Sequence, residues 1–170
     1  MKECVKAMLY AYALLDTVSE DYEEHIRNKA ILSCLRTEPA RVLAEKIALE
    51  ILEKRVLETF KGRVETILSS LTEIERSLVT IRYFGKERKT KERLVAPKKD
   101  GGWGERKYFR EQAKLLDKLC ERFDRAGLTK TYFEAELMQI DIFEKVFRAL
   151  RKRLQKRVTL RRKARFSVDG

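Results

Sequence analysis

The chain has few of the residues that form most enzyme sites. His25 is the only histidine among 170 residues, and the cysteines, Cys4, Cys34 and Cys120, lie far apart. A histidine-based metal site or a serine–histidine–aspartate triad therefore lacks its main component. The glycine-rich stretch at residues 101–104 has no strand pattern before it and no lysine–serine pair after it, so it does not match a phosphate-binding loop. We predict a protein that is not an enzyme and needs no cofactor.

Glycine and proline are also scarce, at 7 and 2 residues, which favours long helices over a turn-rich β fold. No apolar run approaches the roughly 20 residues needed to cross a bilayer. The N-terminal Met-Lys-Glu-Cys-Val-Lys carries an acid and lacks the small-residue cleavage site of a signal peptide. Three widely spaced cysteines suit reduced thiols. We therefore expect an all-α cytoplasmic protein that has no membrane partner.

Apolar residues recur at helical spacing through most of the sequence. This periodicity predicts a multi-helix bundle with helices at residues 2–16, 19–35, 39–70, 73–84, 105–126 and 131–157. Ser19 can cap the second helix, Pro39 suits the first position of the third, and Thr129 or Thr131 can cap the last. A short helix within residues 86–96 must end at Pro97. Two faces are predicted to be buried: Ile74, Leu78 and Ile81 in one helix, and Tyr108, Leu115, Leu116, Leu119 and Phe123 in another.

The charge is divided unequally between the two halves of the chain. Residues 1–85 contain 13 Lys and Arg against 14 Asp and Glu, whereas residues 86–170 contain 26 against 13. The whole net charge of +12 therefore comes from the second half. A surface of that sign attracts a polyanion, although a solvated basic face that only confers solubility is the alternative.

Two segments on either side of residues 86–102 resemble a known family. Residues 71–85 read Leu-Thr-Glu-Ile-Glu-Arg-Ser-Leu-Val-Thr-Ile-Arg-Tyr-Phe-Gly, with a capping box of Thr72 and Glu75 and a glycine stop. Residues 103–119 read Trp-Gly-Glu-Arg-Lys-Tyr-Phe-Arg-Glu-Gln-Ala-Lys-Leu-Leu-Asp-Lys-Leu. Together they resemble the first and last helices of the region-four DNA-binding domain of bacterial sigma factors, and of small sigma-like regulators of Gram-positive bacteria, phages and mobile elements. The segment between them is longer than the family's turn and lacks its alanine–glycine pair.

The resemblance implies a divergent helix-turn-helix at residues 71–127. It implies transcription regulation, with double-stranded DNA as a partner and RNA polymerase as a candidate partner. We expect residues 1–70 to serve packing or homodimerisation, and residues 128–170 to form a long C-terminal amphipathic helix with a basic tail. Trp103, set between glycines, could stack on a base or anchor its loop to the core, and the anchor is the favoured interpretation.

The candidate nucleic-acid-binding residues fall into two sets. One set lies at helical spacing and is expected to meet base edges in the major groove: Arg106, Lys107, Arg110 and Lys114. The other set is expected to hold phosphates: Lys86, Lys89, Lys91, Lys98, Lys99, Arg157, Arg161, Arg162, Lys163 and Arg165. Two alternatives stay open, a sequence-independent binder of RNA or DNA backbones and a helical protein–protein interaction module.

Overall fold

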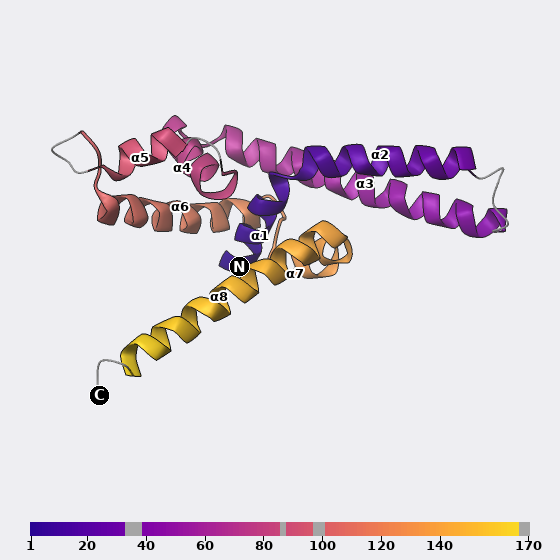
Figure 1. Cartoon of the computed structure of the whole chain (residues 1–170). Helices are drawn as coiled ribbons and strands as arrows, with labels where there is room; N and C mark the ends of the chain where they lie inside the picture. The colour runs from indigo at the N-terminus through magenta and orange to yellow at the C-terminus, as the bar shows by residue number, and fades with distance from the viewer. Residues whose placement is uncertain (33–38, 86–87, 97–100, 167–170) are drawn as a thin grey trace.

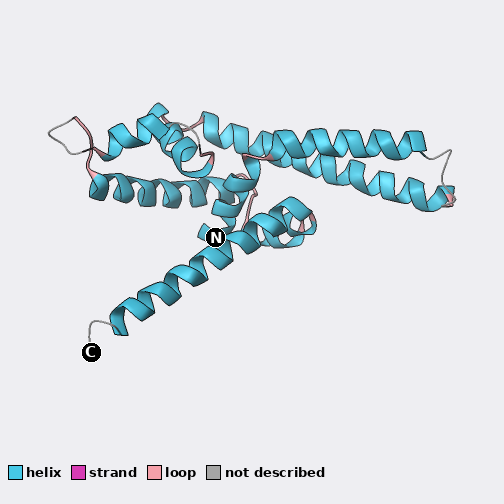
Figure 2. Ribbon diagram, in the orientation of Figure 1, coloured by secondary structure: helices cyan, strands magenta, loops and turns pink. Residues whose placement is uncertain are grey.

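Most of the described chain is helical in the computed structural model, which describes residues 1–32, 39–85, 88–96 and 101–166. The elements, in order, are α1 (Lys2–Tyr12), α2 (Leu15–Leu32), α3 (Ala40–Ser69), α4 (Glu73–Tyr83), α5 (Arg88–Val95), α6 (Glu105–Arg125), α7 (Lys130–Ala135), the 3₁₀ turn η3 (Leu137–Gln139) and α8 (Asp141–Phe166). These ranges contain no strand, which confirms the all-α prediction (Figure 2). No described helix is long and apolar enough to cross a membrane.

The N-terminal helix α1 lies at the centre of the molecule (Figure 1). Val5, Met8 and Leu9 are fully buried, and the helix packs against α8, α6 and α4. A salt bridge of 2.5 Å from Lys2 to Asp117 adds a polar link between α1 and α6. The first residues of the chain therefore hold together elements from its second half.

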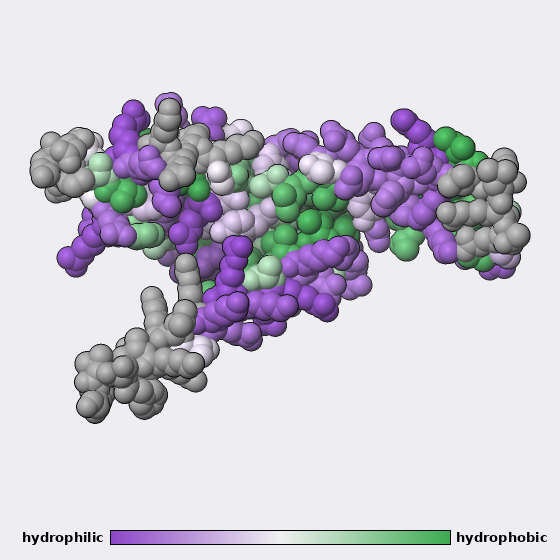
Figure 3. All heavy atoms as spheres, in the orientation of Figure 1, coloured by the Kyte–Doolittle hydropathy of each residue, from purple (hydrophilic) through white to green (hydrophobic). Residues whose placement is uncertain are grey.

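Helices α2 and α3 form a hairpin that extends away from this centre (Figure 1). Tyr22 donates a hydrogen bond of 2.7 Å to Glu53, and Lys61 pairs with Asp16 at 2.6 Å. Large apolar side chains stay exposed on both helices of the hairpin, among them Ile31 and Leu52. Hydrophobic residues accordingly show at the outer part of the hairpin as well as near α7 (Figure 3). The inner end of α3, by contrast, is buried in the shared core.

The start and end of α4 match the sequence prediction. The Thr72 hydroxyl accepts from the Glu75 amide at 3.3 Å, and the Thr72 amide donates to the Glu75 carboxylate at 3.0 Å, which completes the capping box. Gly85 follows with φ of 65°, a left-handed conformation that favours glycine. The predicted buried face is only partly right, because Leu78 and Ile81 are buried whereas Ile74 is 57% exposed.

Two predicted helix boundaries are wrong. The first break lies at residues 13–14 instead of 17–20, so Ser19 sits inside α2 and caps nothing. The helix predicted at 131–157 is divided into α7, η3 and α8, and Ile140 has the extended ψ of 123°. Thr129, rather than Thr131, caps α7 by accepting from the Tyr132 amide at 3.1 Å.

Aromatic packing explains the division of the last helix. The rings of Phe133 and Phe147 lie edge to face with centroids 5.3 Å apart. In one continuous helix these residues would be about 21 Å apart along the axis. The bend at Ile140 folds α7 back on α8, and Phe143 then packs against Phe60 of α3 with centroids 5.0 Å apart. Contacts among these rings, of which Phe60, Phe133 and Phe143 are fully buried, outweigh the local helical preference of the segment.

Candidate nucleic-acid interface

The junction between α5 and α6 is held closed by backbone hydrogen bonds. The Trp103 amide donates to the Leu94 carbonyl at 2.9 Å, and the Gly104 amide donates to the Ala96 carbonyl at 2.8 Å. A helix-turn-helix normally joins its helices with three or four residues, whereas residues 96–104 lie between α5 and α6 here. Since the two bonds join the ends of this longer connection, α6 begins next to the end of α5.

Gly102 makes that closure possible. A Cβ atom at this position would lie 2.2 Å from the Ala96 carbonyl oxygen and 2.7 Å from the Arg93 carbonyl oxygen. Both neighbours are backbone atoms, so they cannot turn aside as a flexible side chain would. The close approach of the two chain segments therefore requires glycine.

Trp103 has the position expected of an anchor. Its side chain is partly buried and packs against the hydrophobic core. The ammonium of Lys107 lies 5.1 Å from the centre of the indole ring, a cation–π contact. The packing favours the anchor interpretation, because much of the ring is covered by the protein itself.

The back of α6 is buried as predicted. Tyr108, Leu115, Leu116, Leu119 and Phe123 are all buried. These five side chains set which way the opposite, polar face of the helix points.

Sequence reasoning missed Gln112, whose side chain is 8% exposed. Its amide nitrogen donates to the Leu78 carbonyl of α4 at 2.9 Å and to the Tyr108 hydroxyl at 3.2 Å. The available clue was a polar residue four positions after Tyr108 within an otherwise apolar stripe. These bonds fix α6 in register against α4.

The four residues predicted to contact bases share the outer face of α6. Arg106, Lys107, Arg110 and Lys114 are all exposed. Glu111 lies among them, with its carboxylate 3.6 Å from the Arg110 guanidinium and 3.2 Å from the Lys114 ammonium. One carboxylate thus offsets part of the positive charge of this set, which we call the α6 stripe.

The predicted phosphate-binding set is described only in part. Lys91 is exposed on α5. The other members lie outside the described residues or have side chains outside the described part: Lys86, Lys89, Lys98, Lys99, Arg157, Arg161, Arg162, Lys163 and Arg165.

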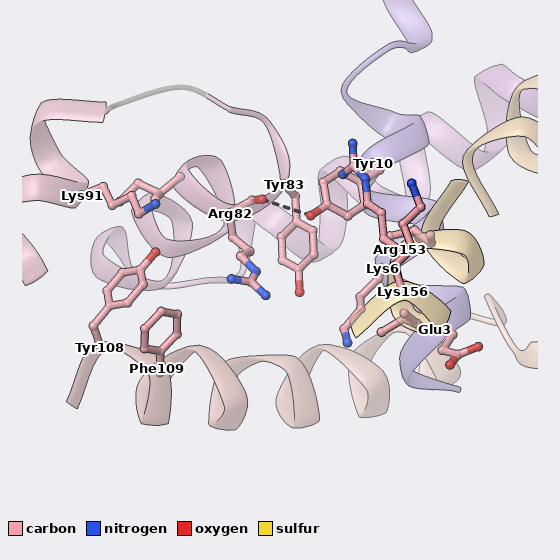
Figure 4. Close-up of a pocket in the computed structure, with 13 residues that line it drawn as sticks. Glu3, Lys6, Tyr10, Arg82, Tyr83, Lys91, Tyr108, Phe109, Arg153 and Lys156 are labelled. Atoms are coloured by element: carbon pink, nitrogen blue, oxygen red, sulfur yellow. Dashed lines mark hydrogen bonds between the residues drawn. The ribbon is translucent and has the colours of Figure 1, made fainter. Parts of the chain in front are cut away.

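A groove that no single segment of the sequence indicates lies against α6 at Tyr108 and Phe109 (Figure 4). It has a volume of about 1000 Å³ and is lined by residues of α1, α4, α5, α6 and α8. Five of its lining residues are cations: Lys6, Arg82, Lys91, Arg153 and Lys156. Only Lys91 was among the predicted site residues. Lys6 lies on α1, Arg82 on α4, and Arg153 and Lys156 on α8, so no single sequence spacing could have grouped all of them.

Aromatic side chains form part of the wall of this groove. Tyr10 and Tyr83 lie edge to face with centroids 5.2 Å apart, and the Tyr10 hydroxyl donates to the Arg82 carbonyl at 3.4 Å. Burial raises the pKa of Tyr83 to about 12, against a smaller opposing effect of Arg82, so its phenol stays neutral. Phe109 differs from these tyrosines because 48% of it is exposed.

Comparison of this chain with protein-family models, with curated proteins and with solved structures finds no match in any of the three. Within the described residues, no three His, Cys, Asp or Glu side chains are grouped so that they could hold a metal ion. The resemblance to sigma-factor region four therefore stays a prediction, and the case for function depends on the geometry of α4 to α6 and of the groove.

Proposed function

We propose that this protein binds double-stranded DNA through the outer face of α6 and acts as a non-catalytic transcription regulator. The observation that supports this proposal is the structure of α6 itself. The helix carries four exposed cations over little more than two turns, on a back fixed by buried leucines and by the Gln112 bond to α4. A cationic side chain held on a rigid helix can stay against one base edge long enough to select it.

Within this proposal the members of the α6 stripe have different tasks. Arg106 and Arg110 suit bidentate contact with guanine, because a guanidinium presents two parallel donors. Lys114 suits a phosphate at the edge of the contact, where a point charge is sufficient. The ammonium of Lys107 already lies over the Trp103 ring. To bind DNA it would either move away from the ring or contact the ring and a DNA group at the same time. RNA polymerase remains a candidate partner on the resemblance alone.

One observation favours a second candidate, a sequence-independent binder of nucleic-acid backbones. Glu111 pairs with Arg110 and Lys114, two of the four residues expected to contact bases. A carboxylate in that position repels phosphates and competes for the same guanidinium. If those pairs persist on DNA, the remaining charge attracts the duplex but selects no base.

Fluorescence anisotropy across a salt series distinguishes the two candidates, with one duplex obtained by selection and one scrambled duplex. Arg110→Ala should weaken binding to the selected duplex by about 1–3 kcal/mol and affect the scrambled duplex less. Deletion of residues 158–170 should weaken both duplexes alike. It should also lower the salt slope by about 0.9 for each phosphate that the shortened protein no longer neutralises.

Arg125→Ala is the matched control, because Arg125 is an exposed cation near the far end of the same helix and pairs with Glu121 at 3.9 Å. It should leave both affinities unchanged. An equal decrease in affinity for both duplexes in Arg110→Ala would establish the backbone binder in place of the sequence-specific one. No binding of the parent protein to either duplex at low salt would refute both candidates.

A further inference from the structure

We propose that the groove between α1, α4, α5, α6 and α8 binds a single-stranded segment of nucleic acid, with one base stacked on Phe109. This is a second binding site, distinct from the α6 stripe and independent of whether duplex DNA is bound there. The proposal is based on three features of the groove: unpaired positive charge, the way that charge is spread, and an exposed aromatic ring.

The groove concentrates positive charge that the protein leaves uncompensated. Within the described residues, none of its five cations forms a salt bridge. Two cations nearer the start of α8 are paired, since Arg148 lies 2.5 Å from Glu144 and Lys145 pairs with Asp141. Among the described residues that line the groove, Glu3 is the only acidic one. A cleft lined by charge of one sign focuses the electrostatic field and attracts an anion.

The cations are arranged along a line instead of around one point. Figure 4 shows Lys91 toward one end of the groove, Arg82 near the middle, and Lys6, Arg153 and Lys156 toward the other end. A single phosphate group would need its donors to converge, as they do in a dedicated anion pocket. A row of separated charges instead matches the repeated phosphates of an extended chain.

Phe109 gives the groove an exposed aromatic ring, which a site for phosphates alone would not need. Its ring is 48% exposed and is held edge to face against buried Tyr108, with centroids 5.3 Å apart. Exposing so much of a phenylalanine to water is unfavourable unless something covers it. In a duplex the faces of the bases are already stacked on one another, whereas an unpaired base offers its face to an aromatic side chain. The ring next to the cations therefore favours a single strand over a duplex.

The test measures anisotropy of a labelled 12-nucleotide single strand of mixed sequence, with its own duplex measured in parallel. Phe109→Ala should weaken single-strand binding by about 5- to 150-fold, the range for removal of one stacked base. Phe109→Tyr should restore it, because tyrosine keeps the aromatic face. The duplex should bind both variants as it binds the parent protein.

A double variant, Arg153→Ala with Lys156→Ala, tests the charge. It should lower the salt slope of single-strand binding by about 0.7 for each phosphate that the variant no longer neutralises. Lys145→Ala serves as the charge control, since Lys145 is already paired with Asp141 near the start of the same helix. Leu49→Ala serves as the apolar control, since Leu49 is 56% exposed on the α2–α3 hairpin. Circular dichroism melts confirm that each variant is folded.

Three results would overturn the proposal. The parent protein could fail to bind the single strand at low salt. Phe109→Ala could weaken the single strand and the duplex equally, which would make the groove an extension of the duplex site. A free mononucleotide, at the same concentration of nucleotide units, could displace the strand completely, which would assign the groove to a small ligand. Failure of duplex binding alone would refute the proposed function and leave this site in place.

Discussion

Gly102 offers the sharpest test of the α5–α6 junction. In Gly102→Ala the added methyl group would lie 2.2 Å from the Ala96 carbonyl oxygen and 2.7 Å from the Ala96 carbonyl carbon, far inside ordinary contact distance. Since the obstructing atoms belong to the backbone, the junction must open. Overpacking of this kind costs about 1–3 kcal/mol. Opening would also break the bonds from the Trp103 and Gly104 amides, each of which contributes about 0.5–1.5 kcal/mol.

We therefore expect Gly102→Ala to lower the free energy of unfolding by about 2–6 kcal/mol in urea titrations followed by circular dichroism. Gly62→Ala is the matched control, because Gly62 is exposed within α3 and a Cβ there would meet nothing within 4 Å. That change should raise stability by about 0.5–1 kcal/mol, as alanine favours helices more than glycine does. If Gly102→Ala stays within about 0.5 kcal/mol of the parent protein, as an ordinary surface change would, the junction is not closed in the way that its hydrogen bonds indicate.

Four further substitutions test separate parts of the α4–α6 unit. Leu119→Ala should cost about 2–5 kcal/mol and Arg110→Ala less than about 0.5 kcal/mol, and thermal melts with the reverse ranking would show that the helix faces are misassigned. Gln112→Ala should cost about 1–3 kcal/mol, because the buried Leu78 carbonyl loses its donor across the α4–α6 contact, and a neutral result would show that this bond does not stabilise the protein. Partial burial alone would raise the pKa of the Glu75 carboxyl, but the Lys118 ammonium at 2.6 Å, together with the Thr72 amide, holds that pKa below its ordinary value. A lowered pKa adds stability at pH values above the pKa of the unfolded chain, and this gain disappears as pH falls through the pKa of the folded protein. Glu75→Gln should therefore be less stable than the parent protein at pH 7, and the difference should disappear at acid pH, where the carboxyl is protonated in both states.

Local sequence patterns predicted those features that depend on neighbours in the chain. The cap at Thr72 and the buried face of α6 belong to this kind, since each is determined by residues three or four positions apart. Ile74 has the same spacing as its neighbours, yet it is 57% exposed whereas Leu78 and Ile81 are buried. Hydrophobic periodicity identifies the apolar face of a helix, but it does not show how much of that face neighbouring helices cover.

Features that depend on distant contacts could not be predicted. The bend at Ile140 follows from the rings of Phe133, Phe143 and Phe147, which meet only when the chain folds back. The groove is even harder to predict from local sequence patterns, because its cations belong to α1, α4, α5 and α8. The basic tail and the α6 stripe could be predicted because the members of each set lie close together in the sequence. The groove cations come from several helices and are brought together only by folding.

The central place of α1 has a consequence for synthesis of the protein on the ribosome. Residues 2–12 emerge early, but α8, against which they pack, begins at Asp141. At about 5–20 residues per second, roughly 6–26 s pass before that partner is made. During this interval Val5, Met8 and Leu9 lack their final cover and are exposed to chaperones and to other nascent chains. The outer part of the α2–α3 hairpin, where the two helices contact each other, can form within that time. We therefore expect it to fold first and the core around α1 to close only as α8 emerges.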